Sequence, residues 1–80
     1  MRLPRDVSGA DLARRLSRIG YRITRQTGSH MRLTIDAPTQ HHVTVPKHDA
    51  LRLGTLSGIL EEVAAHLEIT RDDLISRLFD

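Results

Sequence analysis

Apolar side chains recur at three- and four-residue intervals near the start of the chain, which predicts a helix from Val7 to Gly20. The apolar positions that share one side of it are Leu12, Ala13, Leu16 and Ile19. Ser8 can cap the first turn, with Asp11 three residues later in a capping-box pattern. Gly20 is the expected stop at the other end, because glycine readily terminates a helix.

Polar and apolar residues then alternate one by one, which predicts three short strands. These run from Tyr21 to Gln26, from His30 to Ile35 and from His41 to Val45. Thr27-Gly28-Ser29 predicts a tight turn between the first two strands, in which glycine supplies a positive φ. We expect Tyr21 and Ile23 to point into the core. The side chains expected on the opposite, outward face are Arg22, Thr24, Gln26, His30, Arg32, Thr34, His42 and Thr44.

Helical spacing returns in the last third of the chain and predicts two more helices. One begins at Thr55, capped by Thr55 or Gly54, and continues to Leu67. The other runs from Arg71 to Phe79, where Thr70 and Asp73 repeat the capping-box pattern. Short connections between the strands favour an antiparallel meander. The expected architecture is therefore an α+β fold of order α-β-β-β-α-α, with one three-stranded antiparallel sheet and helices on one face.

Charge is distributed unevenly along the 80 residues, although the net charge is only +2. Residues 1–35 carry +6, residues 36–60 are neutral and residues 61–80 carry −4. The basic part contains the predicted hairpin, and such a surface favours a polyanionic partner. One Tyr and one Phe provide no aromatic platform on which nucleic-acid bases could stack.

The chain contains no cysteine and no long apolar segment. Disulfides, thiolate metal sites and a transmembrane helix are therefore not expected. The segment from Met1 to Pro4 is not followed by the apolar run of a secretory signal. We expect a cytoplasmic protein with a single domain over residues 1–80.

Metal and serine chemistry find little support in the pattern. The five histidines form no H-x-x-x-H or H-x-H pair, His41 and His42 should point to opposite faces, and carboxylates are not clustered. We therefore expect neither a metal nor another cofactor. A nucleophilic Ser29 would need His30 as its base, but sequence neighbours usually cannot approach each other as this requires. Ser29 is expected to serve the turn or to donate a hydrogen bond to phosphate.

Metal-free RNA cleavage requires fewer catalytic groups from the protein, because the substrate's own 2′-hydroxyl is the nucleophile. Histidine can transfer the proton, since its unperturbed pKa of about 6.5 lies near working pH. Arginine or lysine can stabilise the negative phosphorane. His30, with Arg25, Arg32 and Lys47, fits this description, and the need for a 2′-hydroxyl would select RNA over DNA. An exposed loop histidine without a catalytic role stays an open alternative from the pattern alone.

Several short motifs nevertheless occur together in one order. They are Ile19-Gly20-Tyr21, Arg25-Gln26-Thr27-Gly28-Ser29-His30, Val43-Thr44-Val45-Pro46 with Lys47-His48, Gly54-Thr55-Leu56 with Ile59-Leu60, and Ile69-Thr70-Arg71-Asp72-Asp73-Leu74. With this set the chain resembles HicA-type toxins, the RNA-cleaving halves of bacterial toxin–antitoxin pairs, from about residue 8 to the end. It departs from them at Met31, where many members have a second histidine or an aromatic residue, and at Ser57-Gly58, where a basic residue is common.

The resemblance implies a double-stranded-RNA-binding-domain-like fold and metal-independent cleavage of mRNA by His30, the histidine of the family's glycine-serine-histidine motif. Lys47 and His48 match the family's basic segment and are expected RNA contacts. In the leading hypothesis, the backbone of Gly28 and Ser29 is available for close approach of the RNA. The resemblance also implies a HicB-type antitoxin that covers the His30 face, with DNA bound only indirectly through the antitoxin complex.

Three other readings stay open. The same fold could bind RNA without cutting it, or could serve as an interaction protein through its apolar helices and acidic tail. A DNA-binding helix-turn-helix from residues 55–79 is disfavoured, because that segment carries half of the acidic residues and is negatively charged. The second acid–base group is also open, with His42 on the sheet and His48 in the loop as candidates.

Overall fold

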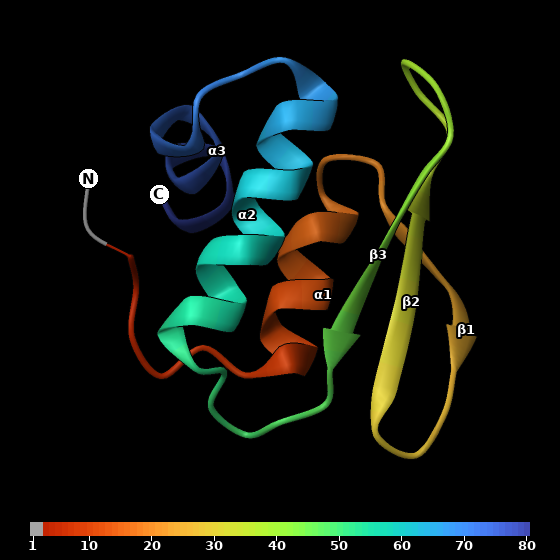
Figure 1. Ribbon diagram of the computed structural model, residues 1–80, viewed down its shortest axis with the longest axis vertical. Coiled ribbons are helices and arrows are strands. Elements are labelled where there is room, and N and C mark those ends of the chain that lie inside the picture. Colours follow the sequence, from red (N-terminus) through yellow and green to blue (C-terminus); the bar gives the residue numbers. More distant parts are fainter. Residues whose placement is uncertain (1–2) are drawn as a thin grey trace.

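The computed structural model describes residues 3–80, which form three helices and one antiparallel sheet (Figure 1). The elements are α1 (Gly9–Ser17), β1 (Arg22–Gln26), β2 (His30–Ile35), β3 (His41–Pro46), α2 (Leu53–Leu67) and α3 (Arg71–Phe79). The sheet order is β1-β2-β3, and the helices lie on one side of it. The predicted α+β fold and its order α-β-β-β-α-α are confirmed. Met1 and Arg2, part of the segment judged not to be a secretory signal, lie outside the described residues.

Two of the three predicted helix starts are confirmed by their capping bonds. Ser8 Oγ accepts a 2.9 Å hydrogen bond from the backbone N–H of Asp11. Thr70 Oγ1 accepts one of 3.0 Å from the N–H of Asp73. Each bond satisfies a donor that the first turn of a helix leaves without a partner. Helix α1 ends earlier than predicted, and the turn after it reaches Gly20, whose φ of 113° only glycine adopts easily.

Helix α2 begins at Leu53, two residues before the predicted start, and neither Thr55 nor Gly54 caps it. Its N-cap is Arg52, which makes no capping bond through its side chain. The start is fixed instead by tertiary contact, because the N–H of Leu51 donates a 2.8 Å bond to the carbonyl of Val7. This bond joins the chain before α2 to the chain before α1.

The strand register differs from simple alternation at one place. Strand β1 pairs Ile23 with Leu33 but Arg25 with Arg32, so Thr24 is an extra residue in a β-bulge. Beyond the bulge, Arg25 shares the outward face of Arg32, and Gln26 lies opposite Met31 on the helix-facing side. The predicted outward position of Gln26 is therefore wrong, because alternation cannot continue through a bulge.

One burial prediction is wrong, and one residue on its predicted face is nevertheless covered. Ile23 faces the helices as expected, but its side chain is 49% exposed because β1 is an edge strand and α1 leaves it uncovered. Thr34 lies on the outward face yet is only 2% exposed. Its hydroxyl lies 2.8 Å from Thr24 Oγ1 and 2.7 Å from His42 Nδ1, and these two side chains cover it from either side.

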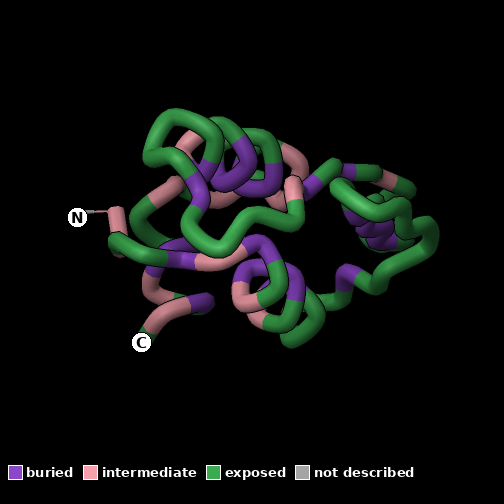
Figure 2. Tube along the Cα trace, turned by 90° about the horizontal axis from the view of Figure 1, so that it is seen from below, coloured by how far each residue is buried: buried purple, intermediate pink, exposed green. Residues whose placement is uncertain are grey.

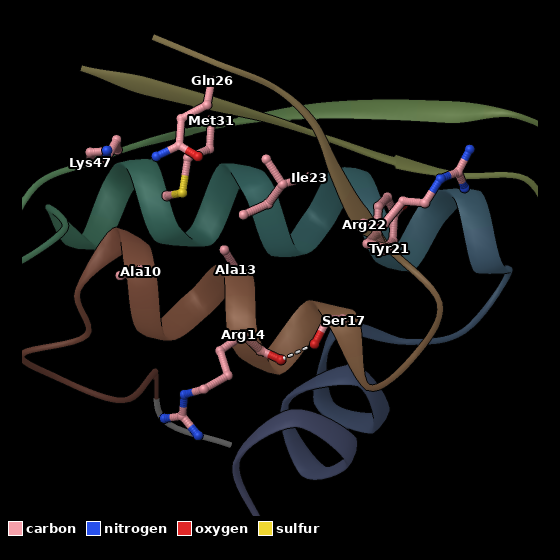
Figure 3. Close-up of a pocket in the computed structure, with 10 residues that line it drawn as sticks. All are labelled: Ala10, Ala13, Arg14, Ser17, Tyr21, Arg22, Ile23, Gln26, Met31 and Lys47. Atoms are coloured by element: carbon pink, nitrogen blue, oxygen red, sulfur yellow. Dashed lines mark hydrogen bonds between the residues drawn. The ribbon is translucent and has the colours of Figure 1, made fainter. Parts of the chain in front are cut away.

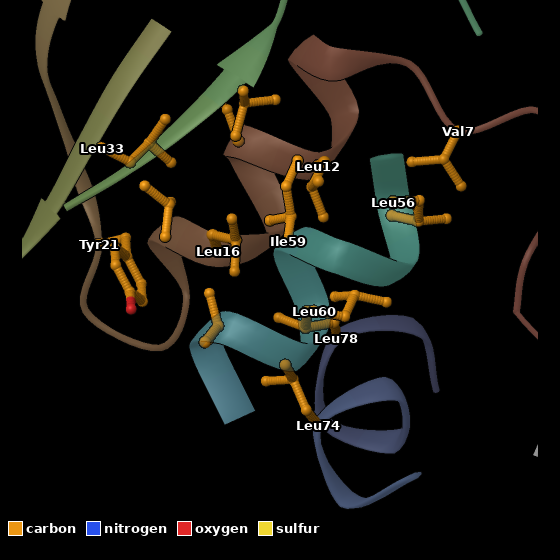
Figure 4. Packing of buried hydrophobic residues seen from close by; sticks show 14 of the residues in the cluster. Val7, Leu12, Leu16, Tyr21, Leu33, Leu56, Ile59, Leu60, Leu74 and Leu78 are labelled. Carbon is orange, nitrogen blue, oxygen red and sulfur yellow. The ribbon is translucent and has the colours of Figure 1, made fainter. Parts of the chain in front are cut away.

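The core lies between the sheet and the helices and is built mainly from aliphatic side chains of the three helices and of β2 and β3, while β1 contributes none (Figure 4). The fully buried leucines are Leu12, Leu16, Leu33, Leu56, Leu60, Leu74 and Leu78. Buried positions recur along each helix, whereas the turns that connect the elements are mostly exposed (Figure 2). No helix within residues 3–80 has both the length and the apolar composition needed to cross a membrane.

A close backbone contact joins α1 to the end of β3. The N–H of Gly9 donates a 2.9 Å hydrogen bond to the carbonyl of His48. A Cβ added at Gly9 would lie 1.9 Å from the carbonyl oxygen of Pro46. Glycine is needed here for lack of space, and the contact fixes the segment that follows β3 beside the start of α1.

Candidate functional site

The turn between β1 and β2 is held by Thr27. Its N–H donates a 2.9 Å bond to the carbonyl of His30, and its hydroxyl accepts a 3.1 Å bond from the N–H of His30. Gly28 does not lie in the left-handed region, so the predicted positive φ is wrong. The threonine side chain supplies the closing contact that a positive-φ glycine was expected to provide. A Cβ at Gly28 would meet nothing within 4 Å, and the surface beside the turn is open.

His30 is the first residue of β2, and its side chain is exposed on the outward face. Its Nδ1 lies 2.9 Å from the hydroxyl oxygen of Ser29. The expectation that these sequence neighbours cannot approach each other is therefore wrong, because the turn brings the hydroxyl alongside the ring. The ring has no second hydrogen-bond partner among residues 3–80, so Nε2 faces solvent. The serine therefore orients an imidazole whose other nitrogen is open to a ligand.

Two arginines flank this histidine on the same face. Arg32 is two positions along β2 from His30, and the bulge at Thr24 places Arg25 directly across from Arg32. Within the part of the chain that the structure describes, neither Arg25 nor Arg32 forms an ion pair. Arg22, at the other end of β1, differs, because its guanidinium lies 2.7 Å from the Asp36 carboxylate.

Charge is therefore concentrated at one end of the outward face. The hydrogen bond from Arg22 lowers the pKa of Asp36, so this exposed carboxylate at the far end of the face stays ionised. The sheet strands themselves contribute no carboxylate to the face. His30, Arg25 and Arg32 thus form a basic surface suited to a phosphate group.

Lys47 and His48 are not gathered onto this face. The N–H of Lys47 donates a 2.9 Å bond to the carbonyl of Ser29, which extends the pairing of β2 and β3 by one position. The Lys47 side chain lies with Met31 on the helix-facing side, where both line a groove between α1 and β1 (Figure 3). His48 is exposed in the following loop, and its backbone carbonyl binds Gly9. Lys47 is therefore near the turn in the strand register but on the other side of the sheet from His30.

His42 shares the outward face, yet the register separates it from His30. His42 pairs with Thr34, and Thr34 is four residues along β2 from His30. Four residues of a strand span roughly 13 Å. A general acid and a general base must both reach the atoms of one phosphate, so His42 is too distant to complete that pair. The sequence pattern placed both histidines on one face but could not supply this separation.

The other strand histidine belongs to a partly buried cluster that the sequence did not reveal. As predicted, His41 points away from His42, and its ring stacks on His66 with the centroids 4.4 Å apart. Its Nδ1 lies 2.8 Å from the Tyr21 hydroxyl. Burial, followed by the neighbouring His66, lowers the pKa of His41, although Glu62 opposes the shift. Burial also raises the pKa of Tyr21 to about 12. These groups join α2 to the sheet and do not reach the outward face.

Ligand groups for a metal ion are scattered over the described chain. Within residues 3–80, no three or more His, Asp or Glu side chains come together in a way that could hold a metal ion. The chemistry available at the outward face is therefore proton transfer by an imidazole and charge stabilisation by guanidinium groups.

Comparison with known proteins bears on the segment that contains this site. Residues 9–64 match the family described as HicA toxin of bacterial toxin–antitoxin systems. The matched segment includes α1, the whole sheet and most of α2, with the Gly28-Ser29-His30 turn inside it. No curated protein and no solved structure matches the chain.

Proposed function

The chain belongs to the HicA toxin family, as its motifs predicted, and we propose that it is a metal-independent endoribonuclease with His30 as its catalytic residue. Family membership makes the chain a toxin of a toxin–antitoxin system, for which a HicB-type antitoxin is the general partner. One arrangement supports the enzymatic proposal. The exposed His30 ring is held at Nδ1 by Ser29, and it lies beside Arg25 and Arg32, neither of which forms an ion pair within residues 3–80.

The proposed reaction begins with attack of a ribose 2′-hydroxyl on the adjacent phosphorus. The 2′-oxygen loses its proton, the bond from phosphorus to the 5′-oxygen breaks, and that oxygen gains a proton as it leaves. The product is a 2′,3′-cyclic phosphate, and no external oxidant or metal takes part. The requirement for a 2′-hydroxyl makes RNA the substrate and leaves DNA uncut.

The bond between Ser29 and His30 allows either protonation state at the free nitrogen. When both ring nitrogens are protonated, the Nδ1–H donates to the Ser29 hydroxyl, and the Nε2 proton can be delivered to the leaving oxygen, which leaves a neutral ring. When Nδ1 carries the proton and donates to Ser29, Nε2 can accept the proton of the 2′-hydroxyl. Arg25 and Arg32 stabilise the negative phosphorane between these steps.

The substrate is a single RNA strand lying on the outward face. Open space at Gly28 admits the phosphate close to the turn, and the buried Thr34 holds His42 ready to contact the strand farther along. The substrate class is mRNA in the cytoplasm, and the antitoxin inhibits cleavage by covering the His30 face. His48 contributes an RNA contact at the margin of this face, whereas the Lys47 side chain lies on the other side of the sheet and takes no part in this RNA surface.

The test is a cleavage assay on labelled RNA at low salt with excess chelator. The wild type should cut RNA and leave an all-DNA copy intact, and His30→Ala should abolish cutting while it still binds RNA. His42→Ala is the matched control, because it removes an imidazole too distant to act on the same phosphate, and it should retain most of the activity. Equal cutting by His30→Ala and the wild type would refute the assignment.

A non-catalytic RNA-binding module is the second candidate, because the register leaves His30 without a second imidazole on the sheet within reach. Under this alternative the wild type binds RNA with strong salt dependence but cuts nothing, and His30→Ala weakens binding only slightly. The same assay therefore separates the two functions.

A further inference from the structure

A groove lies between α1 and β1, on the helix-facing side of the sheet, away from His30 (Figure 3). Its volume is ≈ 630 Å³. Its apolar lining comes from Ala10 and Ala13 of α1 and from Ile23 and Met31 of the sheet. The groove exists because α1 carries alanines at these positions, so that helix and strand do not meet through large side chains.

The strand that borders this groove is the edge of the sheet. Strand β1 pairs only with β2 among the strands of residues 3–80, so the backbone groups of its outer edge are free for another strand. Ile23 points over the groove and is 49% exposed, more than any other large apolar side chain in the described chain. An exposed apolar side chain, an apolar floor and an unpaired strand edge therefore coincide at one place.

The rim of the groove is basic. Three of its ten lining residues are Arg14, Arg22 and Lys47, and none is acidic. Arg14 and Arg22 contact Asp11 and Asp36, but both guanidinium groups are exposed, and an ion pair at an exposed group is weak and easily exchanged. Lys47 has no ion pair within residues 3–80. A ligand that fills this groove should therefore carry apolar groups at its centre and negative charge at its ends.

We propose that this groove is an anchoring site for the antitoxin, which docks an extended segment with apolar and acidic side chains along β1. Its backbone adds a strand to the sheet edge, an apolar side chain packs over Ala10 and Ala13 beside Ile23, and carboxylates meet the basic rim. RNA fits this site poorly, because Tyr21, the aromatic residue of the lining, is only 1% exposed and cannot stack on a base.

Anchoring and inhibition are then carried by different surfaces. The groove and the catalytic face lie on opposite sides of the sheet, joined at the turn where Lys47 pairs with Ser29. An antitoxin held in the groove can reach around this end to cover His30. The inference rests on the proposed function only in taking the HicB-type antitoxin of this toxin family as the occupant.

The test measures binding of the full-length antitoxin encoded with this toxin, using two groove variants with matched controls. Ile23→Thr removes the exposed apolar side chain but keeps a residue that favours strands. Ala10→Glu places a bulky carboxylate in the groove at an exposed position of the first helical turn, where an acidic residue stabilises the helix. The controls are Leu53→Thr, which changes the other exposed large apolar residue, and Ala50→Glu in an exposed loop.

Both groove variants should bind the antitoxin at least about tenfold more weakly than the wild type, while both controls bind normally. RNA cleavage by the isolated groove variants should be unchanged, and His30→Ala should retain full antitoxin binding. Unaltered antitoxin binding by Ile23→Thr and Ala10→Glu would overturn the proposal. The proposal would also be overturned if these variants lost RNA binding or self-association but still bound the antitoxin. If no variant cuts RNA but the groove variants still lose the antitoxin, only the proposed function fails.

Discussion

Replacement of Gly9 by alanine tests the contact that joins α1 to β3. The added methyl group would lie 1.9 Å from the Pro46 carbonyl oxygen and 3.0 Å from its carbonyl carbon. These are backbone atoms, so they cannot rotate away as a flexible side chain could. Either α1 moves away from the sheet, or the end of β3 shifts together with the segment that begins at Lys47.

The expected cost follows from two opposing effects. Alanine favours a helix over glycine by up to about 1 kcal/mol. Overpacking costs about 1–3 kcal/mol, and straining the bond from the Gly9 N–H to the His48 carbonyl costs about 1 kcal/mol more. We expect Gly9→Ala to lower the free energy of unfolding by about 2 kcal/mol. In a chain of 80 residues this lowers Tm by roughly 8–16 °C.

Gly58→Ala is the matched control. Gly58 lies inside α2, and a Cβ built there meets nothing within 4 Å. This variant should therefore gain roughly 0.5–1 kcal/mol of stability from helix propensity alone. Urea unfolding followed by circular dichroism measures both variants. Equal stabilisation by Gly9→Ala and Gly58→Ala would show that α1 does not pack against β3 as closely as described.

The remaining predictions concern the core and the turn. Tyr21 is the only tyrosine, so absorbance titration reports it alone, with a midpoint at about 12 in the folded protein. Because the unfolded phenol ionises near 10, unfolding releases a proton between these values, and stability should fall as pH rises from about 10 to 12 in the wild type but not in Tyr21→Phe. Arg15→Ala should cost about 1–3 kcal/mol in urea unfolding, since it removes a 2.8 Å bond to the Leu78 carbonyl and a cation–π contact, whereas the exposed Arg14→Ala should cost about 0.5 kcal/mol or less. Gly28→Ala should leave stability within about 0.5 kcal/mol, because its Cβ meets no atom, but should slow RNA cleavage by narrowing the space beside the turn.

Local interactions explain why most of the fold could be predicted. The caps at Ser8 and Thr70 depend on residues three positions apart, and the structure contains both bonds. Strand alternation correctly placed His30 and Arg32 on the outward face. Strand β2 itself contains no extra residue, because the bulge lies in its neighbour β1. The motif around His30 was also visible in the sequence, and the family match to residues 9–64 supports the resemblance drawn from it.

Features that depend on two distant segments could not be predicted. The start of α2 at Leu53 is set by contact with Val7, rather than by a capping residue near it. The bond from Ser29 to His30 depends on how Thr27 closes the turn, and that closure occurs without a positive φ at Gly28. At α2 the sequence suggested Thr55 or Gly54 as the cap, and the bond between Leu51 and Val7 takes that role. At the turn it suggested a positive φ at Gly28, and the contacts of Thr27 close the turn instead.

The sequence by itself determined the elements, their order and the polar character of the sheet's outward face, because helix periodicity, caps and strand alternation act over a few residues. Only the tertiary structure decided which side chains meet. The bulge at Thr24 moved Arg25 to the side of His30, and the register separated His42 from it. The uncovered edge beside Ile23 likewise arises only when α1 packs on the sheet. Such outcomes depend on pairing and packing between segments far apart in the chain, which no local pattern encodes.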